Sequence, residues 1–247
     1  MINQAEVYLR NAAAMWTALI PDAQPGRGLL RVDLPGSTRV LLREPPDADT
    51  LAAIGRLAPT TPVLLEDVFA DPESPALTPA STTLRMPVMN RPAGAFDAAP
   101  PAVRVIEVHD PGTLADAERV MVDGFPFPRY QPWVRAQALP PRVLALPGWR
   151  VWLAYVDAAP AAAAYTYDDG HASGVYWLAT LPEHRSRGLG RAVLTAAIAA
   201  RPDQQFTLVA TEAGRPLYES LGFATVATAT WHTRPPLAEP VPRQAGR

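Results

Sequence analysis

The succession of elements between residues 149 and 200 constrains this chain most strongly. Apolar side chains recur at every second position of residues 149–156, a spacing typical of a strand. Residues 159–167 and 174–181 read as two further strands, and Asp168-Asp169-Gly170 between them is a hairpin signal. An alanine-rich stretch, residues 190–200, follows with high helix propensity. Strands joined by short turns and followed by a helix predict a sheet that helices cover.

The rest of residues 103–233 continues this alternation of strands and helices. Before the three strands, we expect a strand at 104–108, a helix at 110–122 and a short helix at 135–139. After the alanine-rich helix, we expect a strand at 205–211, a helix at 215–221 and a final strand at 225–233. This order predicts an α/β fold built on a mixed sheet, with helices on both faces.

The first 90 residues predict a smaller α/β domain. We expect a helix, two strands, a helix and two strands, at residues 3–19, 29–34, 39–42, 47–57, 62–68 and 82–89. Several prolines and a glycine then interrupt residues 91–103 and oppose a regular element there. We therefore expect an N-terminal domain at 1–92, a linker at 93–102, the main domain at 103–233 and a flexible tail at 234–247.

Composition excludes several classes of function. The chain has no cysteine, which excludes disulfides, thiolate zinc sites and cysteine nucleophiles, and we expect no metal. With 22 basic and 24 acidic residues and no basic block, nucleic acid is not an expected partner. No signal-peptide pattern opens the chain and no apolar run approaches the length of a membrane span, so we expect a cytoplasmic protein without a membrane partner. Abundant arginine, alanine and proline without any lysine indicate a GC-rich, bacterial genome.

A phosphate-binding pattern lies where the third strand meets the alanine-rich helix. Gly188 and Gly190 stand near the start of this helix, where they allow a ligand to approach the backbone closely. The first N–H groups of a helix lack intrahelical partners and favour negative charge. Arg185, Arg187 and Arg191 add positive charge nearby. The segment therefore predicts a cradle for a pyrophosphate. The dinucleotide fingerprint would need a third glycine, and the P-loop a lysine that this chain lacks.

Two motifs resemble those of the GNAT acetyltransferase superfamily. Arg185-x-x-Gly188-x-Gly190, between a strand and a helix, resembles its acetyl-CoA signature. About 30 residues later, Tyr218-x-x-x-Gly222-Phe223 resembles its second hallmark. The order of elements agrees with that family from residue 103 to 233. The resemblance implies a GNAT fold, acetyl-CoA as co-substrate and two central strands that are parallel and splay apart.

The resemblance also implies roles for particular residues. Tyr218 would act as general acid toward the departing thiolate, although an aromatic residue on a short helix also commonly just packs. The backbone of one strand would bind pantetheine and the following loop would bind the pyrophosphate. These expected cofactor-binding residues are Leu178, Ala179, Thr180, Arg185, Ser186, Arg187, Gly188, Leu189, Gly190 and Arg191.

The general base is not identified. Many family members carry a glutamate at the position that aligns with Gly174, and glycine cannot act. The candidates in this region are His171, Tyr176, Glu212 and Asp168, while a hairpin position such as His171 is also commonly just solvated. Near the second motif, the family often has an asparagine where this chain has Thr211. A cluster of aromatic residues, Phe125, Phe127, Tyr130 and Trp133, either lines an acceptor pocket or anchors a loop.

Three functions fit these patterns. The first is an N-acetyltransferase that acts on a primary amine of a small molecule. The second is a non-catalytic acyl-CoA-binding or regulatory protein, which the glycine at 174 motivates. The third is a protein N-terminal acetyltransferase. Residues 1–90 loosely resemble the second half of a GNAT domain, so the chain would be a tandem with a degenerate first copy. That half would pack against the catalytic half, shape the acceptor cleft or form a homodimer.

Overall fold

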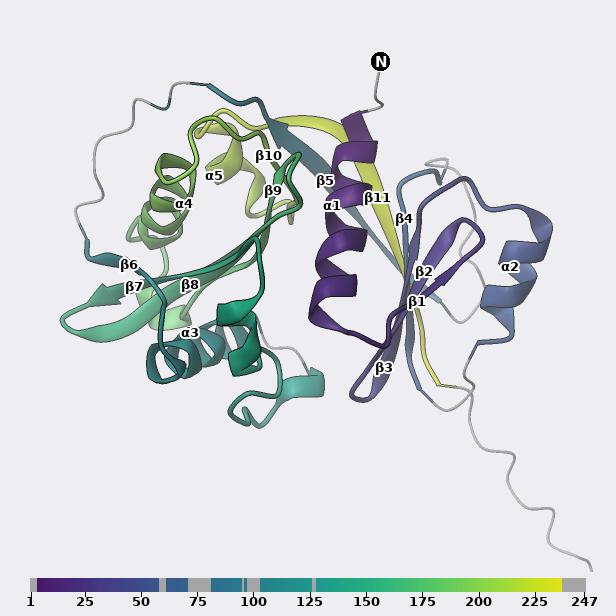
Figure 1. Ribbon diagram of the computed structural model, residues 1–247, viewed down its shortest axis with the longest axis horizontal. Helices are drawn as coiled ribbons and strands as arrows, with labels where there is room; N and C mark the ends of the chain where they lie inside the picture. Colours follow the sequence, from purple (N-terminus) through teal and green to yellow (C-terminus); the bar gives the residue numbers. More distant parts are fainter. Residues whose placement is uncertain are drawn as a thin grey trace, which may run out of the picture. The chain divides into compact units, whose positions relative to one another are not determined.

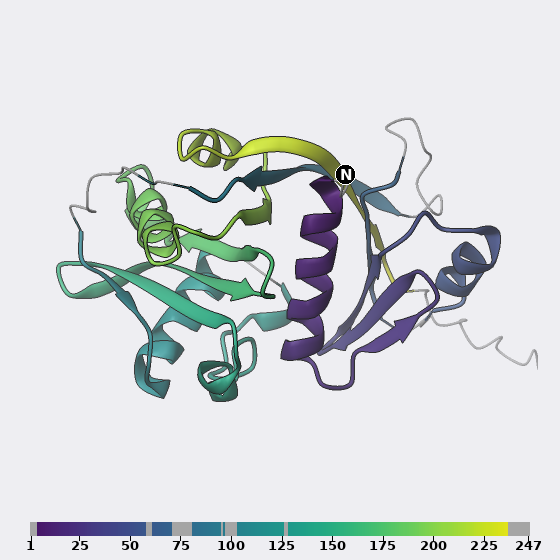
Figure 2. The same cartoon turned by 45° about the horizontal axis from the view of Figure 1, so that its top comes forward.

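The computed structural model describes residues 4–57, 61–70, 81–94, 96, 103–125 and 128–236 (Figures 1 and 2). The chain forms two compact units, each built from two separate stretches of sequence. The first unit holds Met1–Pro21 and Met86–Thr228, and the second holds Asp22–Arg85 and Ala229–Arg247. The chain therefore passes between the units three times.

The sheet of the first unit is mixed, which confirms the predicted fold class. Its strand order is β5-β10-β9-β8-β7-β6. Neighbouring strands are antiparallel except β9 and β10, which are parallel. The bounds are β5 (Thr82–Arg91), β6 (Val105–Glu107), β7 (Trp149–Val156), β8 (Ala159–Asp168), β9 (Ser173–Thr180) and β10 (Phe206–Val209). β11 (Ala224–Arg234) begins in this unit and continues in the second.

Helices cover both faces of this sheet. α3 (Pro111–Gly124) and α4 (Leu189–Ala199) lie on opposite sides of β7 and β8 (Figure 1). Trp152 and Ala154 of β7 pack with Leu189 and Val193 of α4. α3 begins at Asp110, whose carboxylate accepts hydrogen bonds from the first N–H groups of the helix. The short α5 (Arg215–Glu219) precedes β11.

The first unit also contains two elements from the N-terminal part of the sequence. α1 (Gln4–Leu19) contacts β8, β9 and β10, and the Tyr165 hydroxyl lies 3.9 Å from the sulfur of Met15. β5 pairs with the whole of β10, from Phe206↔Arg91 to Val209↔Val88. The predicted division at 1–92 and 103–233 does not match these units, because α1 and most of β5 belong with the main domain. Most of the predicted linker and tail lies outside the described residues.

The second unit has the strand order β1-β2-β3-β4-β11. β3 and β4 are parallel and the other pairs are antiparallel. Their bounds are β1 (Gln24–Gly26), β2 (Leu29–Leu34), β3 (Ser37–Leu42) and β4 (Val63–Asp67), with α2 (Ala48–Gly55) packed on them. The six predicted N-terminal elements are therefore confirmed, and β1 is added.

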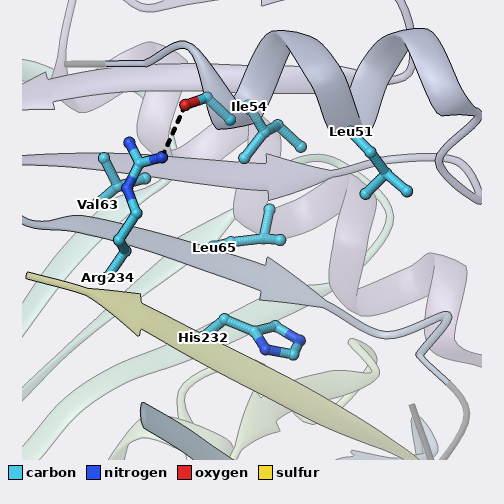
Figure 3. A pocket seen from close by; sticks show the side chains of 7 residues that line it. Leu51, Ile54, Val63, Leu65, His232 and Arg234 are labelled. Atoms are coloured by element: carbon cyan, nitrogen blue, oxygen red, sulfur yellow. Dashed lines mark hydrogen bonds between the residues drawn. The ribbon is translucent and has the colours of Figure 1, made fainter. Parts of the chain in front are cut away.

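A small cavity of ≈ 40 Å³ lies between α2 and strands β4 and β11 (Figure 3). Its walls are apolar except for His232 and Arg234. The Arg234 guanidinium donates to the carbonyl oxygens of Gly55, at 3.0 Å, and Leu57, and so ties β11 to the end of α2. Burial lowers the pKa of His232, and the Asp67 carboxylate nearby opposes part of this shift.

The segment after α3 differs from the prediction. The expected helix at 135–139 is a loop, and a 3-10 helix, η2, follows it at Pro141–Ala145. The loop is held by Glu118 of α3, which is fully buried. Its carboxylate accepts hydrogen bonds from the N–H groups of Ala136 (2.7 Å), Ala138 (2.7 Å) and Leu139 (2.9 Å). Because the carboxylate satisfies these three N–H groups, the loop can be buried without intrahelical hydrogen bonds.

We expect residues 103–247 alone not to fold. Without β5, strand β10 loses one of its two neighbours, and Met89 leaves a core that includes Phe206 and Leu208. The buried hydrogen bond between Thr207 and Asn90 (2.7 Å) is also lost. The fragment should be insoluble or lack near-UV circular dichroism, whereas residues 1–236 should remain folded. A cooperative unfolding transition of the fragment would contradict this assignment of β5.

We expect the second unit to lose stability as the pH falls below about 6.5, the value of an unperturbed histidine. Burial lowers the pKa of His232 in the folded state. As the pH falls, the histidine of the unfolded chain therefore takes up a proton before that of the folded chain, and this protonation favours unfolding. His232→Leu should therefore flatten the pH dependence between pH 7.5 and 5.5. Amide hydrogen exchange of residues 229–236 measures it, and His109→Leu, at an exposed histidine of the first unit, is the control. An equal slope in wild type and His232→Leu would contradict the prediction.

Candidate functional site

A cleft opens where β9 and β10 separate. The two strands pair at Phe206↔Ser173 and Thr207↔Gly174, and no further pairing between them is found in the described chain. The cleft beyond these pairs has a volume of ≈ 540 Å³. The other edge of β9 is paired with β8, so its open edge faces the cleft. The walls are formed by Gly124, Phe125, Val175, Trp177, Leu178, Ala179, Thr180, Arg185, Gly190, Val209, Thr211, Ala213, Gly214, Leu217 and Tyr218.

A β-bulge in β9 accompanies the separation. The register with β8 shifts between Ala163↔Ala179 and Tyr165↔Tyr176, which leaves one extra residue on β9. Trp177 has φ 52°, a left-handed conformation that few non-glycine residues adopt. As a result, both Tyr176 and Trp177 contact Tyr165, with ring centroids 5.3 and 5.7 Å apart. Such a bulge twists the strand and turns its backbone groups out of the ladder.

The loop after β9 leads into the N terminus of α4. It contains a 3-10 helix, η3 (Pro182–His184), and two left-handed residues, Ser186 (φ 60°) and Gly188 (φ 75°). The first intrahelical bond runs from Ala192 N–H to Gly188 O (3.0 Å). Within the part of the chain that the structure describes, the N–H groups of residues 186–191 have no backbone partner. Together with the helix dipole, these groups form the kind of cradle that binds an anion.

The two glycines of this loop serve different purposes. Gly188 has a left-handed backbone but open space around its missing Cβ, so its conformation is what requires glycine. Gly190 has ordinary helical geometry and lines the cleft. A Cβ on Gly190 would lie 3.4 Å from Leu217 and 3.7 Å from the Thr180 hydroxyl. It would therefore fit the protein but occupy the space beside the helix N terminus.

The three arginines near the cradle have different surroundings. Arg185 donates to the carbonyl oxygens of Thr180 (3.3 Å) and Gly124 (3.0 Å), and so ties the loop to β9 and α3. Arg191 donates to the Ser220 hydroxyl at 2.6 Å, which joins α4 to the end of α5. Arg187 is exposed and contacts His184 at 3.3 Å. Arg185 and Arg191 are thus held by hydrogen bonds within the protein, whereas Arg187 extends into solvent.

Tyr218 of α5 stands in the wall of the cleft, opposite β9. Its ring packs edge-on against Phe223, with centroids 5.8 Å apart. Burial raises the pKa of Tyr218 to about 12, so the phenol is protonated at neutral pH. Burial is the cause of this shift, and no hydrogen bond within the described residues contributes to it. The sequence placed Tyr218 at the site, and the structure places it in the cleft wall.

Thr211 takes part in the turn before α5. Its hydroxyl accepts a hydrogen bond from Gly214 N–H at 3.1 Å, and its carbonyl oxygen accepts from Gly214 and Arg215. Thr211 also lines the cleft. The residue that replaces the family's asparagine therefore still shapes the start of this helix.

The candidate bases lie in different places. His171 is exposed on the β8–β9 hairpin, and the Glu212 side chain is 67% exposed and pairs with Arg215 at 3.4 Å. Asp168 pairs with Arg201 at 3.6 Å. None of these three, nor Tyr176, is among the residues that line the cleft. Tyr176 lies on β9 between two lining residues, and its hydroxyl donates to the side chain of Asn11 at 2.6 Å.

The aromatic cluster after α3 divides between cleft and core. Phe125 lines the cleft. Tyr130 is buried with Val122 and packs against Trp177 and Trp133. Phe127 lies outside the described residues. For Tyr130, the structure thus supports the anchoring role.

Sequence reasoning missed two buried polar residues, Asn11 and Glu118. Each interrupts the apolar face of a helix at a spacing of four residues: Asn11 lies between Val7 and Met15, and Glu118 between Leu114 and Val122. A polar residue at a core position of an amphipathic helix usually has partners in the fold. That spacing was the signal available in the sequence.

A family model described as "Acetyltransferase (GNAT) domain" matches residues 147–225, which run from β7 to the start of β11. This stretch contains the anion cradle, Tyr218 and all of the cleft wall except Gly124 and Phe125. The chain contains a GNAT acetyltransferase domain. It is an acyltransferase domain, and we call the first unit the GNAT unit.

Solved structures share the GNAT fold over most of the chain. A GCN5-related N-acetyltransferase from Kribbella flavida has a TM-score of 0.63 at 18% identity, over 95% of this chain and 97% of that one. A putative GNAT-family acetyltransferase from Novosphingobium aromaticivorans has a TM-score of 0.56 at 18% identity, over 88% and 94%. A functionally unknown conserved protein from Staphylococcus epidermidis has a TM-score of 0.62 at 12% identity, over 86% and 93%. No curated protein matches the sequence significantly.

The described residues lack two features. None of their helices has the length and apolar character that a membrane span requires. Their His, Asp and Glu side chains form no group of three or more that could hold a metal ion.

We expect Glu118→Ala to lower the free energy of unfolding by about 3 kcal/mol, because it leaves three N–H groups without their acceptor in the interior. Urea denaturation followed by circular dichroism measures the change. Glu219→Ala, which removes a surface ion pair to Arg215, is the control and should cost under about 1 kcal/mol. Equal losses for the two variants would contradict the bracing role of Glu118.

Proposed function

We propose that the GNAT unit transfers the acetyl group of acetyl-CoA to a primary amine of a small molecule. The observation that carries this proposal is the cleft between β9 and β10, which leads to the N terminus of α4 and has Tyr218 in its wall. An extended amide-containing arm suits an open strand edge, because it can pair as an added strand. A pyrophosphate suits the start of a helix. The cleft therefore offers a matching surface to the pantetheine arm and to the pyrophosphate of acetyl-CoA.

In this proposal, the backbone of Leu178, Ala179 and Thr180 binds the pantetheine arm. The N–H groups of residues 186–191, including those of Ser186, Gly188 and Leu189, bind the pyrophosphate. Gly190 leaves room for its oxygens. Arg187 is the arginine that we expect to contact the phosphates, since Arg185 and Arg191 hold the walls of the site.

The reaction would proceed by direct attack within a ternary complex. The neutral amine nitrogen forms a bond to the thioester carbonyl carbon, and the carbon–sulfur bond then breaks with its electron pair on sulfur. Backbone N–H groups at the bulge in β9, near Leu178, are suited to stabilise the developing negative charge on oxygen. Holding both reactants in one cleft supplies much of the acceleration.

Tyr218 would act on the departing sulfur. Its pKa of about 12 lies several units above the value of about 8.5 for an ordinary thiol. Complete proton transfer from this phenol to a thiolate of ordinary pKa would therefore be unfavourable. We infer that Tyr218 mainly donates a hydrogen bond to the sulfur, and that the thiolate takes up the proton that the attacking nitrogen loses, which yields the amide and the CoA thiol.

The acceptor would need to arrive as a neutral amine. Gly174 carries no base, and His171 and Glu212 are outside the cleft wall. The same glycine motivates the second candidate, a non-catalytic acyl-CoA-binding or regulatory protein. Protein N-terminal acetylation is the third. The balanced charge of the chain offers no marked docking surface for a protein, which favours a small acceptor.

Calorimetric titration with acetyl-CoA tests the cofactor site. We expect a Kd in the micromolar range, about −8 kcal/mol. Gly190→Val should weaken binding at least about 10-fold, because its side chain fills the space beside the helix N terminus. Gly55→Val, at a glycine with open space in the second unit, is the control. If folded wild-type protein does not bind acetyl-CoA, the proposed function is wrong.

Tyr218→Phe distinguishes an enzyme from a binding protein. For any amine that releases CoA thiol in a colorimetric screen, we expect kcat to fall roughly 10- to 100-fold. The Kd for acetyl-CoA should change less than about twofold, since the ring and its contact with Phe223 remain. Acetyl-CoA binding without turnover of any amine, peptides with unmodified N termini included, would favour the regulatory alternative.

A further inference from the structure

The position of the family's glutamate is filled by two other side chains. An added Cβ at Gly174 would lie 2.0 Å from Oδ1 of Asn11 and 2.6 Å from the hydroxyl oxygen of Tyr176. Such distances are impossible for real atoms, so the strand accepts no side chain here while those two keep their places. Asn11 belongs to α1, about 160 residues away in the sequence. The glycine is therefore a consequence of the helix that packs over it.

Three hydrogen bonds fix Asn11. Its Nδ2 donates to the carbonyl oxygens of Ala172 (2.8 Å) and Tyr167 (3.1 Å), on either side of the β8–β9 hairpin. Its Oδ1 accepts from the Tyr176 hydroxyl at 2.6 Å. The side chain has no exposed surface. Two carbonyls on one side and a hydroxyl on the other determine the orientation of the amide.

Tyr176 lies beside the cleft at the start of the bulge, although its own side chain is not part of the cleft wall. Val175 and Trp177, its two neighbours on β9, both line the cleft. The Tyr176 ring stacks on Tyr165, with an interplanar angle of 19°, and is half-buried. Its hydroxyl thus lies where Gly174 would otherwise have placed a side chain, at the point where β9 and β10 separate.

We propose that Asn11 is a positioning residue of the active site, and that it holds the Tyr176 hydroxyl as the polar group facing the acceptor amine. This inference rests on the proposed function. Because Tyr176 donates its proton to Asn11, the hydroxyl oxygen is turned to act as an acceptor for an amine N–H. It orients the attacking nitrogen without carrying a charge. Helix α1, outside the stretch that matches the GNAT family model, is then part of the catalytic site.

A merely structural role makes a different prediction. In that case Asn11 only joins α1 to the hairpin, as the ion pair of Arg10 with Asp169 (3.6 Å) also does. Loss of the Tyr176 hydroxyl would then lower the melting temperature and leave catalysis unchanged. A comparison of Tyr176 with Tyr165 distinguishes the two roles. Both tyrosines belong to one aromatic stack, and both hydroxyls contact α1, that of Tyr165 at Met15.

The test uses full-length protein, acetyl-CoA and a panel of tyramine, spermidine, glucosamine and aniline. With the amine that is turned over fastest, Tyr176→Phe should lower kcat/KM for the amine at least about 10-fold. The Kd for acetyl-CoA should change less than about twofold. Tyr165→Phe, the matched control, should leave kcat/KM within about twofold.

Asn11→Ala completes a double-mutant cycle. If Asn11 acts through Tyr176, then Asn11→Ala should lower kcat/KM, and adding Tyr176→Phe should cost less than about a further twofold. Independent, multiplying losses would overturn the positioning role, and so would a lower melting temperature with unchanged kcat/KM in Tyr176→Phe. A protein that binds no acetyl-CoA or turns over no amine would instead overturn the proposed function on which this inference depends.

Discussion

The rest of the GNAT unit depends on the short run of hydrogen bonds between β9 and β10. Two residue pairs join these parallel strands, and then each strand is held by its outer neighbour, β8 or β5. Backbone groups that a continuous sheet would pair are thereby left for a ligand, at the cost of a left-handed tryptophan at the bulge. The outer neighbours keep the strands in place, so the opening does not unravel the sheet.

Different groups around the cleft determine its shape and its electrostatic potential. Arg185 and Arg191 donate hydrogen bonds to carbonyl and hydroxyl groups of the protein. These bonds fix the loop before α4 and join α4 to the end of α5. The N–H groups at the start of α4 then supply fixed positive potential in a defined place. Tyr218 adds a neutral donor whose pKa burial keeps high. A rigid arrangement of this kind needs little reorganisation when charge develops.

Local patterns of the sequence predicted most of the strands and helices and the glycine-containing loop that leads into α4, because turns, periodicity and glycine placement are local properties. They failed where distant segments meet. The proline-rich segment suggested a boundary near residue 93, yet β5 pairs with β10 through Phe206↔Arg91. The loop at 135–139 has the composition of a helix, and Glu118 from another element decides its conformation. Likewise, the sequence alone suggested that Gly174 marks the loss of a catalytic side chain. In the structure, Asn11 of α1 occupies the space that a side chain at position 174 would need.

The path of the chain through the two units has a consequence for the order in which the protein is made. α1 is synthesised first, but its partners on β8 and β9 follow only after the strands of the second unit have been completed up to β4. β4 in turn waits for β11, the last strand of the chain. The second unit therefore cannot finish folding until residues 229–234 of β11 have been made, after every residue of the first unit. The apolar face of α1 must likewise be kept from aggregating until β8 and β9 follow.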